Sequence, residues 1–291
     1  MKKYFITYGD LNFEEAKRRI IHEAEQTGEF DEIIAYSDKD VSPELKSSEI
    51  FSIRRGGGLW SWKPDVMLQT LEKMDENDIL VYCDAGCQLQ VCNEWKWYWK
   101  KLAKHDIIAQ RIFQRTESWT RSEVIKEFES NGRFWPKMFQ YQATIIMKRT
   151  DFSMDFVRQW RNLMIDKPIL AMDVAPDKIH LQHSSFKENR HDQAIYSALI
   201  YRYIDIPETR NRIYSMWEHI EDLDIVSKQA IRATRLRTNQ HETRKAKLKS
   251  IIKRIVKDYI YKPFIIVPQQ AIYGLINKLY LNICKTTKAN D

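Results

Sequence analysis

The chain of 291 residues has few of the residues that mark fibrous or disulfide-stapled proteins: eight glycines, eight prolines and four cysteines. So little glycine and proline excludes a collagen-like or low-complexity chain. No window approaches about 18 uninterrupted apolar residues, so the sequence predicts no membrane-spanning helix. A signal peptide is not expected either, because the apolar run after Met1 covers only residues 4–6.

The few cysteines do not form a metal-binding pattern. Cys83, Cys87 and Cys92 follow the spacing C-x3-C-x4-C, and Cys284 stands far from them. A zinc ribbon requires paired C-x2-C motifs, which this sequence lacks. We therefore expect reduced thiols in a cytosolic protein.

Aromatic residues, in contrast, are plentiful: nine Trp, 14 Tyr and 12 Phe. Such side chains supply enough apolar surface for a large core, which excludes disorder throughout the chain. The length suits one large domain or a domain with an appendage, because single cores rarely grow beyond about 250–300 residues.

Positive charge is concentrated near the C-terminus. Residues 228–262 contain 12 Lys and Arg but only two Asp and Glu, which gives this stretch a net charge of +10. The rest of the chain has a net charge of −3, and the two add up to the +7 of the whole chain. From Leu248 onward, apolar residues recur at helical spacing opposite a row of lysines. We therefore divide the chain into a domain at 1–225 and a basic amphipathic helical segment at 226–291.

A basic amphipathic helix typically lies on an anionic membrane surface, and we expect residues 246–284 to make that contact. The alternative is that its apolar stripes pack on the domain or on a second subunit, as in a homodimer. A nucleic-acid-binding protein that uses the basic segment is a further alternative. Because the cations lie outside the Trp-rich region, no nucleic-acid partner is expected.

The order of the elements predicts an α/β fold. A strand at 4–8, a helix capped by Asn12 and stopped by Gly28, and a strand at 30–36 are typical of an open, mostly parallel sheet flanked by helices. Residues 79–82 are continuously apolar, as in a strand buried on both faces. Further helices are expected at 64–74, 92–104, 153–164 and 189–204, and further strands at 107–113 and 142–147.

Polar residues follow the buried strand at 79–82 directly. Cys83, Asp84, Ala85 and Gly86 stand where ligands bind in open α/β sheets, beyond the carboxyl end of a strand. An Asp beside a Gly can hold a divalent cation or a ribose hydroxyl. An ordinary turn is the alternative.

A loop at 52–64 contains three consecutive glycines between Arg54-Arg55 and Trp62-Lys63. Exposed backbone N–H groups, flanking cations and a following helix N-terminus favour an anion such as a phosphate. The spacing matches neither the P-loop nor the dinucleotide-binding motif. The alternative is a loop whose tryptophans pack into the core.

The third polar feature is Arg190-His191-Asp192-Gln193, at the start of a predicted helix. An Asp in this position often serves only as a cap or as a partner of the helix dipole. The same residues can equally project into a site.

Taken in this order, the three features resemble nucleotide-sugar-dependent glycosyltransferases of the GT-A type, particularly bacterial enzymes of capsule, O-antigen and lipopolysaccharide synthesis. The resemblance covers roughly residues 4–205. It implies a GT-A-like fold and a hexosyltransferase that moves a hexose, guessed to be galactose, from a UDP-sugar to a saccharide or lipid-linked glycan. The enzyme would be cytoplasmic and peripheral, at the inner face of the plasma membrane.

The resemblance also assigns the donor-binding residues one by one: Thr7, Tyr8, Arg54, Trp62, Lys63, Asp84, Ala85, Gly86 and Gln193. Asp84 matches the first Asp of the D-x-D element, which implies a metal ligand for Mn²⁺ or Mg²⁺. Gly86 replaces the second Asp, so a non-catalytic sugar-binding or assembly subunit is another alternative. Asp192 is the implied catalytic residue beside the anomeric carbon, and His191 is the second candidate.

Overall fold

The computed structural model describes residues 1–142, 144–204, 206–217 and 229–234, together with 268–269, 271–273, 275–277 and 279. Most of the predicted membrane contact at 246–284 therefore lies outside the described residues, including the stripe that begins at Leu248. Within the described part of the chain, none of the helices has the length and apolar character that a membrane span requires.

Among the described residues, the main sheet has seven strands in the order β2-β1-β3-β7-β5-β6, with β8 beside β5. Strands β1, β2, β3, β5 and β8 run in one direction, and β6 and β7 run against them. The mostly parallel α/β sheet flanked by helices is therefore confirmed. The strand bounds are β1 Lys3–Tyr8, β2 Glu32–Tyr36, β3 Ile79–Tyr82, β5 Ile107–Arg115, β6 Phe139–Tyr141, β7 Ile145–Lys148 and β8 Ile213–Trp217.

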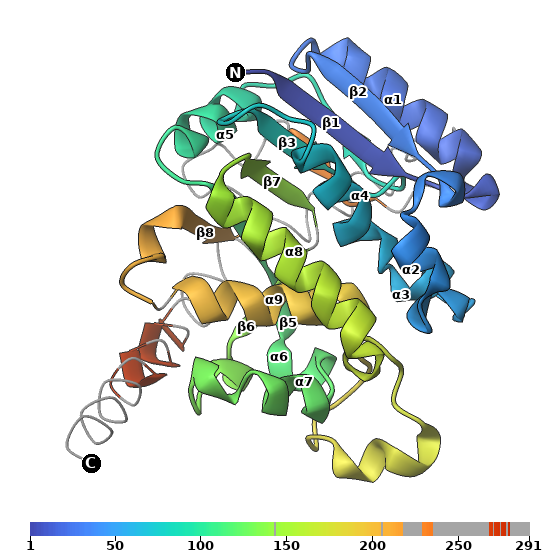
Figure 1. The fold of residues 1–291 in the computed structure, drawn as a ribbon. Coiled ribbons are helices and arrows are strands. Elements are labelled where there is room, and N and C mark those ends of the chain that lie inside the picture. Colours follow the sequence, from blue (N-terminus) through green and yellow to red (C-terminus); the bar gives the residue numbers. More distant parts are fainter. Residues whose placement is uncertain are drawn as a thin grey trace, which may run out of the picture.

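Helices cover both faces of this sheet (Figure 1). The longer ones are α1 Glu14–Thr27, α4 Trp62–Leu71, α5 Glu94–Leu102, α8 Asp151–Asp166 and α9 His191–Ile204. Short helices connect them: α2 Pro43–Ser47, α3 Gly56–Leu59, α6 Thr116–Trp119 and α7 Ser122–Glu127.

Two hydrophobic cores form because successive strand residues point to opposite faces of the sheet. Leu80 and Tyr82 of β3 pack with α4, α8 and α9, and α8 and α9 lie in front of the strands in Figure 1. Ile79 and Val81 pack on the other face with α1 and α5. Strand β3 is thus buried on both sides, which explains its uninterrupted apolar sequence.

Three details of the predicted elements are wrong. Asn12 does not cap α1; it lies in a short 3-10 turn that Asp10 caps, and α1 begins at Glu14. The stretch at 52–64 is not an open loop, because it contains α3 and the first turn of α4, which begins at Trp62. Strands β6 and β8 were not predicted, and the three residues of β6 are too few to show a period. The stop at Gly28 is confirmed, with φ of 64°.

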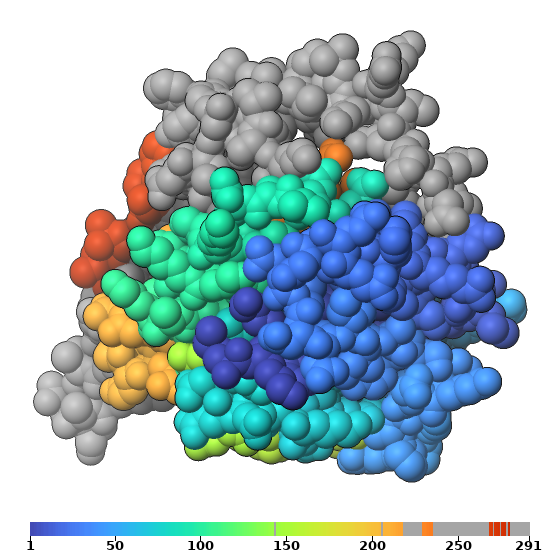
Figure 2. Space-filling model, turned by 90° about the horizontal axis from the view of Figure 1, so that it is seen from above, coloured from blue at the N-terminus to red at the C-terminus, as the bar shows by residue number. Residues whose placement is uncertain are grey.

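The described residues of the C-terminal segment contact the domain through strand β9 Ile231–Arg232, through Gln269, which accepts a hydrogen bond from Arg115 Nη2 (2.5 Å), and through Asn277. Strand β9 pairs antiparallel with β4 Gln88–Leu89. Figure 2 shows residues 229–234 (orange) at the surface beside residues from the first half of the chain. The boundary between 225 and 226 stays a prediction.

Asn277 makes its contact from a helical stretch among the described residues of 268–279. Its side chain accepts a hydrogen bond from Phe134 N (3.0 Å) and donates one to Asn131 O (2.8 Å). Gly132 lies directly beneath it with φ of +97°, and a Cβ there would approach Asn277 Oδ1 to 2.3 Å. Glycine at this position therefore allows the two segments to meet.

Candidate functional site

The site lies at the edge of the sheet where β1 and β3 end. These two strands are parallel neighbours, so their carboxyl ends meet at one edge. Thr7 is fully buried, and its Oγ1 donates a hydrogen bond to Cys83 O (2.9 Å). Its hydroxyl thus fixes the peptide that precedes Asp84, and its predicted donor contact stays a prediction.

Lys63 joins this edge to two other elements. Its side chain leaves the first turn of α4 and is only 3% exposed. Nζ lies 2.8 Å from Asp192 Oδ2, at the start of α9, and 3.3 Å from Asp84 Oδ1, after β3. Residues that are far apart in the sequence therefore form one ion cluster around a buried lysine, which the structure assembles from all three predicted motifs.

Asp84 is the exposed member of this cluster, with 51% of its side chain accessible. Its Oδ1 accepts a hydrogen bond from the Tyr82 hydroxyl at 2.6 Å in addition to the Lys63 contact. Burial raises the pKa of Tyr82, and the negative charge of Asp84 raises it further, so the phenol stays protonated and donates. Among the described residues, the other oxygen of Asp84 has no hydrogen-bond partner and remains available to a ligand.

Asp192 is the buried member, with a side chain 7% exposed. Burial raises the pKa of its carboxyl above the usual 3.8, while the ammonium of Lys63 lowers it and only partly offsets that increase. Its carbonyl oxygen accepts a hydrogen bond from Trp160 Nε1 at 3.1 Å, which fixes the first turn of α9 against α8.

Lys63 stays an ammonium in this setting. Burial lowers its pKa, but the charges of Asp192 and Asp84 raise it by more, so the net shift is upward. Its Nζ also lies 5.4 Å from the ring centroid of Tyr82 and 5.9 Å from that of Trp62, within the range of cation–π attraction.

Aromatic rings surround the cluster. Trp62 stacks on Tyr8 with ring centroids 3.8 Å apart, and its Nε1 donates to Gly56 O at 2.9 Å. Trp60 stacks on the imidazole of His191 at 5.0 Å. The three glycines allow this arrangement because all have positive φ, and a Cβ on Gly58 would lie 3.0 Å from Phe51 Cα.

His191 does not contact Lys63 as Asp192 does; its imidazole has other partners. Its Nδ1 is 2.7 Å from Ala171 O. Because a carbonyl only accepts, we assign the proton to Nδ1. Its Nε2 lies 3.8 Å from Asp173 Oδ1. The residue has φ of 48°, in the left-handed region that non-glycine residues seldom adopt.

The remaining predicted residues lie at the margins. Gln193 Nε2 donates to Gln140 Oε1 (2.7 Å), so this side chain faces β6. Arg54 is exposed and forms no ion pair with any residue that the structure describes. Its neighbour Arg55 instead pairs with Asp173 at 2.7 Å.

Ala85 and Gly86 contribute backbone carbonyls that are held by residues we did not predict. Arg19 of α1 donates from Nη2 to Ala85 O (2.9 Å) and to Cys87 O (2.8 Å). Thr234, just after β9, donates to Gly86 O at 3.1 Å. The loop after β3 is therefore fixed from both sides. Nothing in the sequence signals these distant contacts.

The described residues supply an incomplete set of metal ligands. Among the described residues, no group of three or more His, Cys, Asp and Glu side chains is placed so that it could hold a metal ion. Asp192 is engaged by Lys63, which leaves the free oxygen of Asp84. Mg²⁺ is often held by one or two carboxylates plus substrate phosphates, so Asp84 fits such an ion as a single protein ligand. Mn²⁺ or Mg²⁺ stays a prediction.

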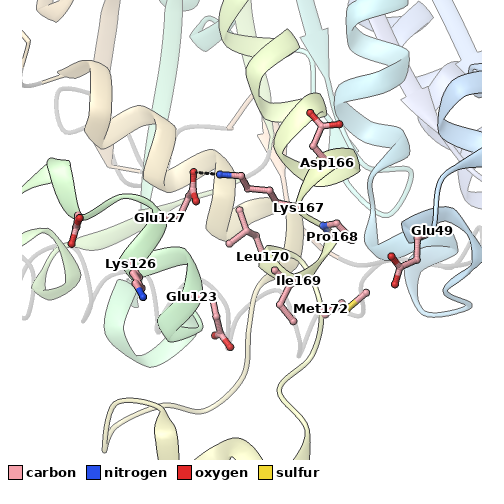
Figure 3. Close-up of a pocket in the computed structure, with 11 residues that line it drawn as sticks. Glu49, Glu123, Lys126, Glu127, Asp166, Lys167, Pro168, Ile169, Leu170 and Met172 are labelled. Atoms are coloured by element: carbon pink, nitrogen blue, oxygen red, sulfur yellow. Dashed lines mark hydrogen bonds and ion pairs between the residues drawn. The ribbon is translucent and has the colours of Figure 1, made fainter.

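A separate hollow of about 770 Å³ opens near the end of α8 (Figure 3). Lys167 and Glu127 form an ion pair at its wall (2.7 Å). Asp84, Lys63 and Asp192 do not line it, so this hollow is distinct from the ion cluster. Its lining residues are Glu49, Glu123, Lys126, Glu127, Glu129, Asp166, Lys167, Pro168, Ile169, Leu170 and Met172.

No family model matches the sequence, and no curated protein matches it. Solved structures that match the chain include the galactosyltransferase LgtC in complex with donor and acceptor sugar analogs, with 11% identity, TM-score 0.34 and coverage of 74% of this chain and 87% of that one. Mouse xyloside xylosyltransferase 1 in its apo form has 8% identity, TM-score 0.39 and coverage of 73% and 84%. An active-site mutant of LgtC has 11% identity, TM-score 0.33 and coverage of 75% and 88%. These neighbours are glycosyltransferases, but the likeness is remote, so the chemistry has to come from the site residues themselves.

Proposed function

We propose that this chain is a glycosyltransferase that moves a hexose from a UDP-sugar to a saccharide or lipid-linked glycan acceptor in surface polysaccharide synthesis. The observation that carries the proposal is the Lys63 cluster, which links an exposed and a buried carboxylate at the carboxyl edge of an α/β sheet. Galactose, the sugar guessed from the resemblance, is the first donor to test.

Glycosyl transfer breaks the bond between the anomeric carbon and the diphosphate and forms a bond to an acceptor oxygen. The acceptor hydroxyl loses its proton, and the nucleoside diphosphate leaves with the bonding electrons. A carboxylate beside the anomeric carbon serves as the base in an inverting enzyme or stabilises the oxocarbenium-like state in a retaining one. Asp192 has that role in our proposal, because it is buried and fixed by Lys63 and by the Trp160 contact to its carbonyl.

The donor nucleotide would bind beyond Asp84. The free oxygen of Asp84 accepts a hydrogen bond from a ribose hydroxyl or binds a divalent cation, and the exposed guanidinium of Arg54 contacts the diphosphate. A bound Mn²⁺ or Mg²⁺ would help neutralise the charge of the leaving group. The stacked pair Tyr8 and Trp62 forms an apolar wall at the end of β1, where the resemblance places the base.

A panel of UDP-, GDP- and dTDP-sugars, each with Mn²⁺, Mg²⁺ or EDTA, tests the proposal. We expect at least one UDP-hexose to raise the melting temperature and to be hydrolysed slowly or transferred to an added glycan. The variant Asp84→Asn is the control, because it should weaken the response to that donor. If no nucleotide sugar has any effect in any condition, the glycosyltransferase proposal fails.

We further propose that the enzyme works at the inner face of the plasma membrane and contacts anionic lipid. Exposed apolar residues support this location: Ile272 (57%), Leu275 (61%) and Leu279 (53%) are accessible, whereas Asn277 on the same helical stretch is buried. The +10 charge of residues 228–262 complements anionic headgroups.

Vesicle co-sedimentation tests the membrane contact. Replacing Leu275 and Leu279 by Gln should reduce pelleting with phosphatidylglycerol vesicles, while phosphatidylcholine vesicles should bind weakly in every case. The matched control replaces Ile179 and Leu181, which are also exposed but lie far away in the sequence. Equal pelleting of both variants and the unchanged protein would contradict a membrane contact through this helical stretch.

A further inference from the structure

Lys63 was assigned to the donor diphosphate by the resemblance, but its surroundings suit a different role. The side chain is 3% exposed, and its ammonium is already in contact with two carboxylates. A diphosphate that bound it directly would have to reach a buried nitrogen and compete with both of them. Replacing such contacts is costly, because a buried carboxylate that loses its partner is strongly destabilised.

The contacts of Lys63 instead connect the two ends of the site. Asp192 Oδ2 and Asp84 Oδ1 both lie within 3.3 Å of the same nitrogen, although they belong to α9 and to the loop after β3. The position of one carboxylate therefore depends on the other through this single atom. The ammonium also occupies the space between them, so a cation bound to the free oxygen of Asp84 would be a separate ion.

We infer that Lys63 is a positioning residue, whose ammonium fixes the Asp192 carboxylate at the reaction centre and ties it to the donor loop at Asp84, while the donor diphosphate binds to exposed cations such as Arg54. This inference rests on the proposed glycosyl transfer. It separates two roles that the sequence pattern combined, because Arg54 belongs to donor binding and Lys63 to the transfer step.

Steady-state kinetics of Lys63→Met and Arg54→Met, with the UDP-sugar that the donor panel identifies, distinguishes these roles. For Lys63→Met we expect kcat to fall by about 10²-fold with little change in the donor KM, since a small misplacement of a reacting group has that effect. For Arg54→Met we expect the donor KM to rise by about tenfold with kcat nearly unchanged, as for the loss of one charged contact. Circular dichroism and melting temperatures check that both variants are folded at the assay temperature, and rates are compared per folded molecule.

Chemical rescue provides the second readout. In Lys63→Ala, methylammonium or ethylammonium should restore part of kcat in a saturable way, because the small cation refills the space between the carboxylates. Asp192→Asn should show no such rescue. A structural defect alone would not respond to the size of the added amine.

The outcomes separate this inference from the proposal beneath it. If the unchanged protein neither binds nor turns over a nucleotide sugar, the glycosyltransferase proposal fails, and the role of Lys63 in transfer fails with it. If the unchanged protein is active but Lys63→Met raises only the donor KM, Lys63 is a diphosphate ligand and the inference alone is overturned. Absence of amine rescue in a folded Lys63→Ala protein would likewise overturn it.

Discussion

Helix α4 carries two buried charges two residues apart, and they end in very different surroundings. Asp65 is 1% exposed, and its oxygens accept hydrogen bonds from Ser42 N (2.9 Å), Ser42 Oγ (2.6 Å), Gln69 Nε2 (2.9 Å) and Arg161 Nε (2.7 Å). Four donors saturate this carboxylate. Its network joins α2, α4 and α8 and leaves nothing on Asp65 for a ligand.

Lys63 belongs to a less complete network. Its partner Asp84 is half exposed and keeps one oxygen without a partner among the described residues, and its partner Asp192 has a raised pKa. A fully satisfied buried network fixes a fold, whereas a network with unused binding capacity at a surface can bind a ligand. The comparison therefore assigns stability to the Asp65 cluster and chemistry to the Lys63 cluster.

The largest expected effect comes from Asp192→Asn. Loss of the carboxylate should reduce kcat by about 10²–10⁴-fold, the range for removal of an acid–base group. The melting temperature should also fall, because the buried ammonium of Lys63 loses its nearer carboxylate and keeps only Asp84, so kcat is compared per folded molecule. Initial rates with the identified donor and calorimetry check both values. A variant that keeps near-normal kcat would break the assignment of chemistry to this cluster.

Arg161→Met should lower the stability of the fold and leave kcat nearly unchanged. It leaves Asp65 buried without its cationic partner, and breaking a buried pair in this way costs about 3–5 kcal/mol. Urea unfolding should report that loss, while kcat per folded molecule should stay close to that of the unchanged protein. A large loss of kcat in a fully folded Arg161→Met protein would show that the two clusters on α4 are not independent.

Much of this arrangement follows from the sequence, because it depends on local patterns. The apolar run before Asp84 predicts a buried strand with a ligand-binding end, and the resemblance, carried by the polar start of α9, points to Asp192 as a second site residue. Their convergence is also expected once the fold is an open α/β sheet, since site residues gather at the carboxyl edge of the strands.

The contacts that give each charge its role were not predictable. Lys63 belongs to the predicted loop at 52–64 and Asp65 to the predicted helix at 64–74. Their partners, Asp192 and Arg161, lie 129 and 96 residues further along the chain. The helical period of α4 does not reveal which of them faces the sheet edge. The same limit applies to Arg19, whose carbonyl partners depend on how α1 packs against the loop after β3.

The pH dependence sharpens the comparison by testing the charges around Asp192. Transfer requires its ionised form, so kcat should fall as the pH drops through its pKa, which lies above the usual 3.8. Asp84→Asn removes a negative charge that raises this pKa, so the acidic limb should move to lower pH. Lys63→Met removes the positive charge that lowers the pKa of Asp192, so the acidic limb of the kcat profile should move to higher pH. Profiles of kcat at saturating donor check both directions; Asp65→Asn, in the other cluster, should leave the limb in place.

The smallest effect tests the Asp65 cluster from its exposed side. Arg161 Nη2 also pairs with Glu44 at 2.7 Å, but the Glu44 side chain is 67% exposed. Water and salt screen such a pair, so Glu44→Gln should cost no more than about 1 kcal/mol in urea unfolding and should leave kcat unchanged. A loss as large as that of Arg161→Met would mean that the exposed carboxylate, and not the saturated Asp65, holds Arg161 in place. The stability of this cluster would then depend on salt concentration, which unfolding at low and high ionic strength would reveal.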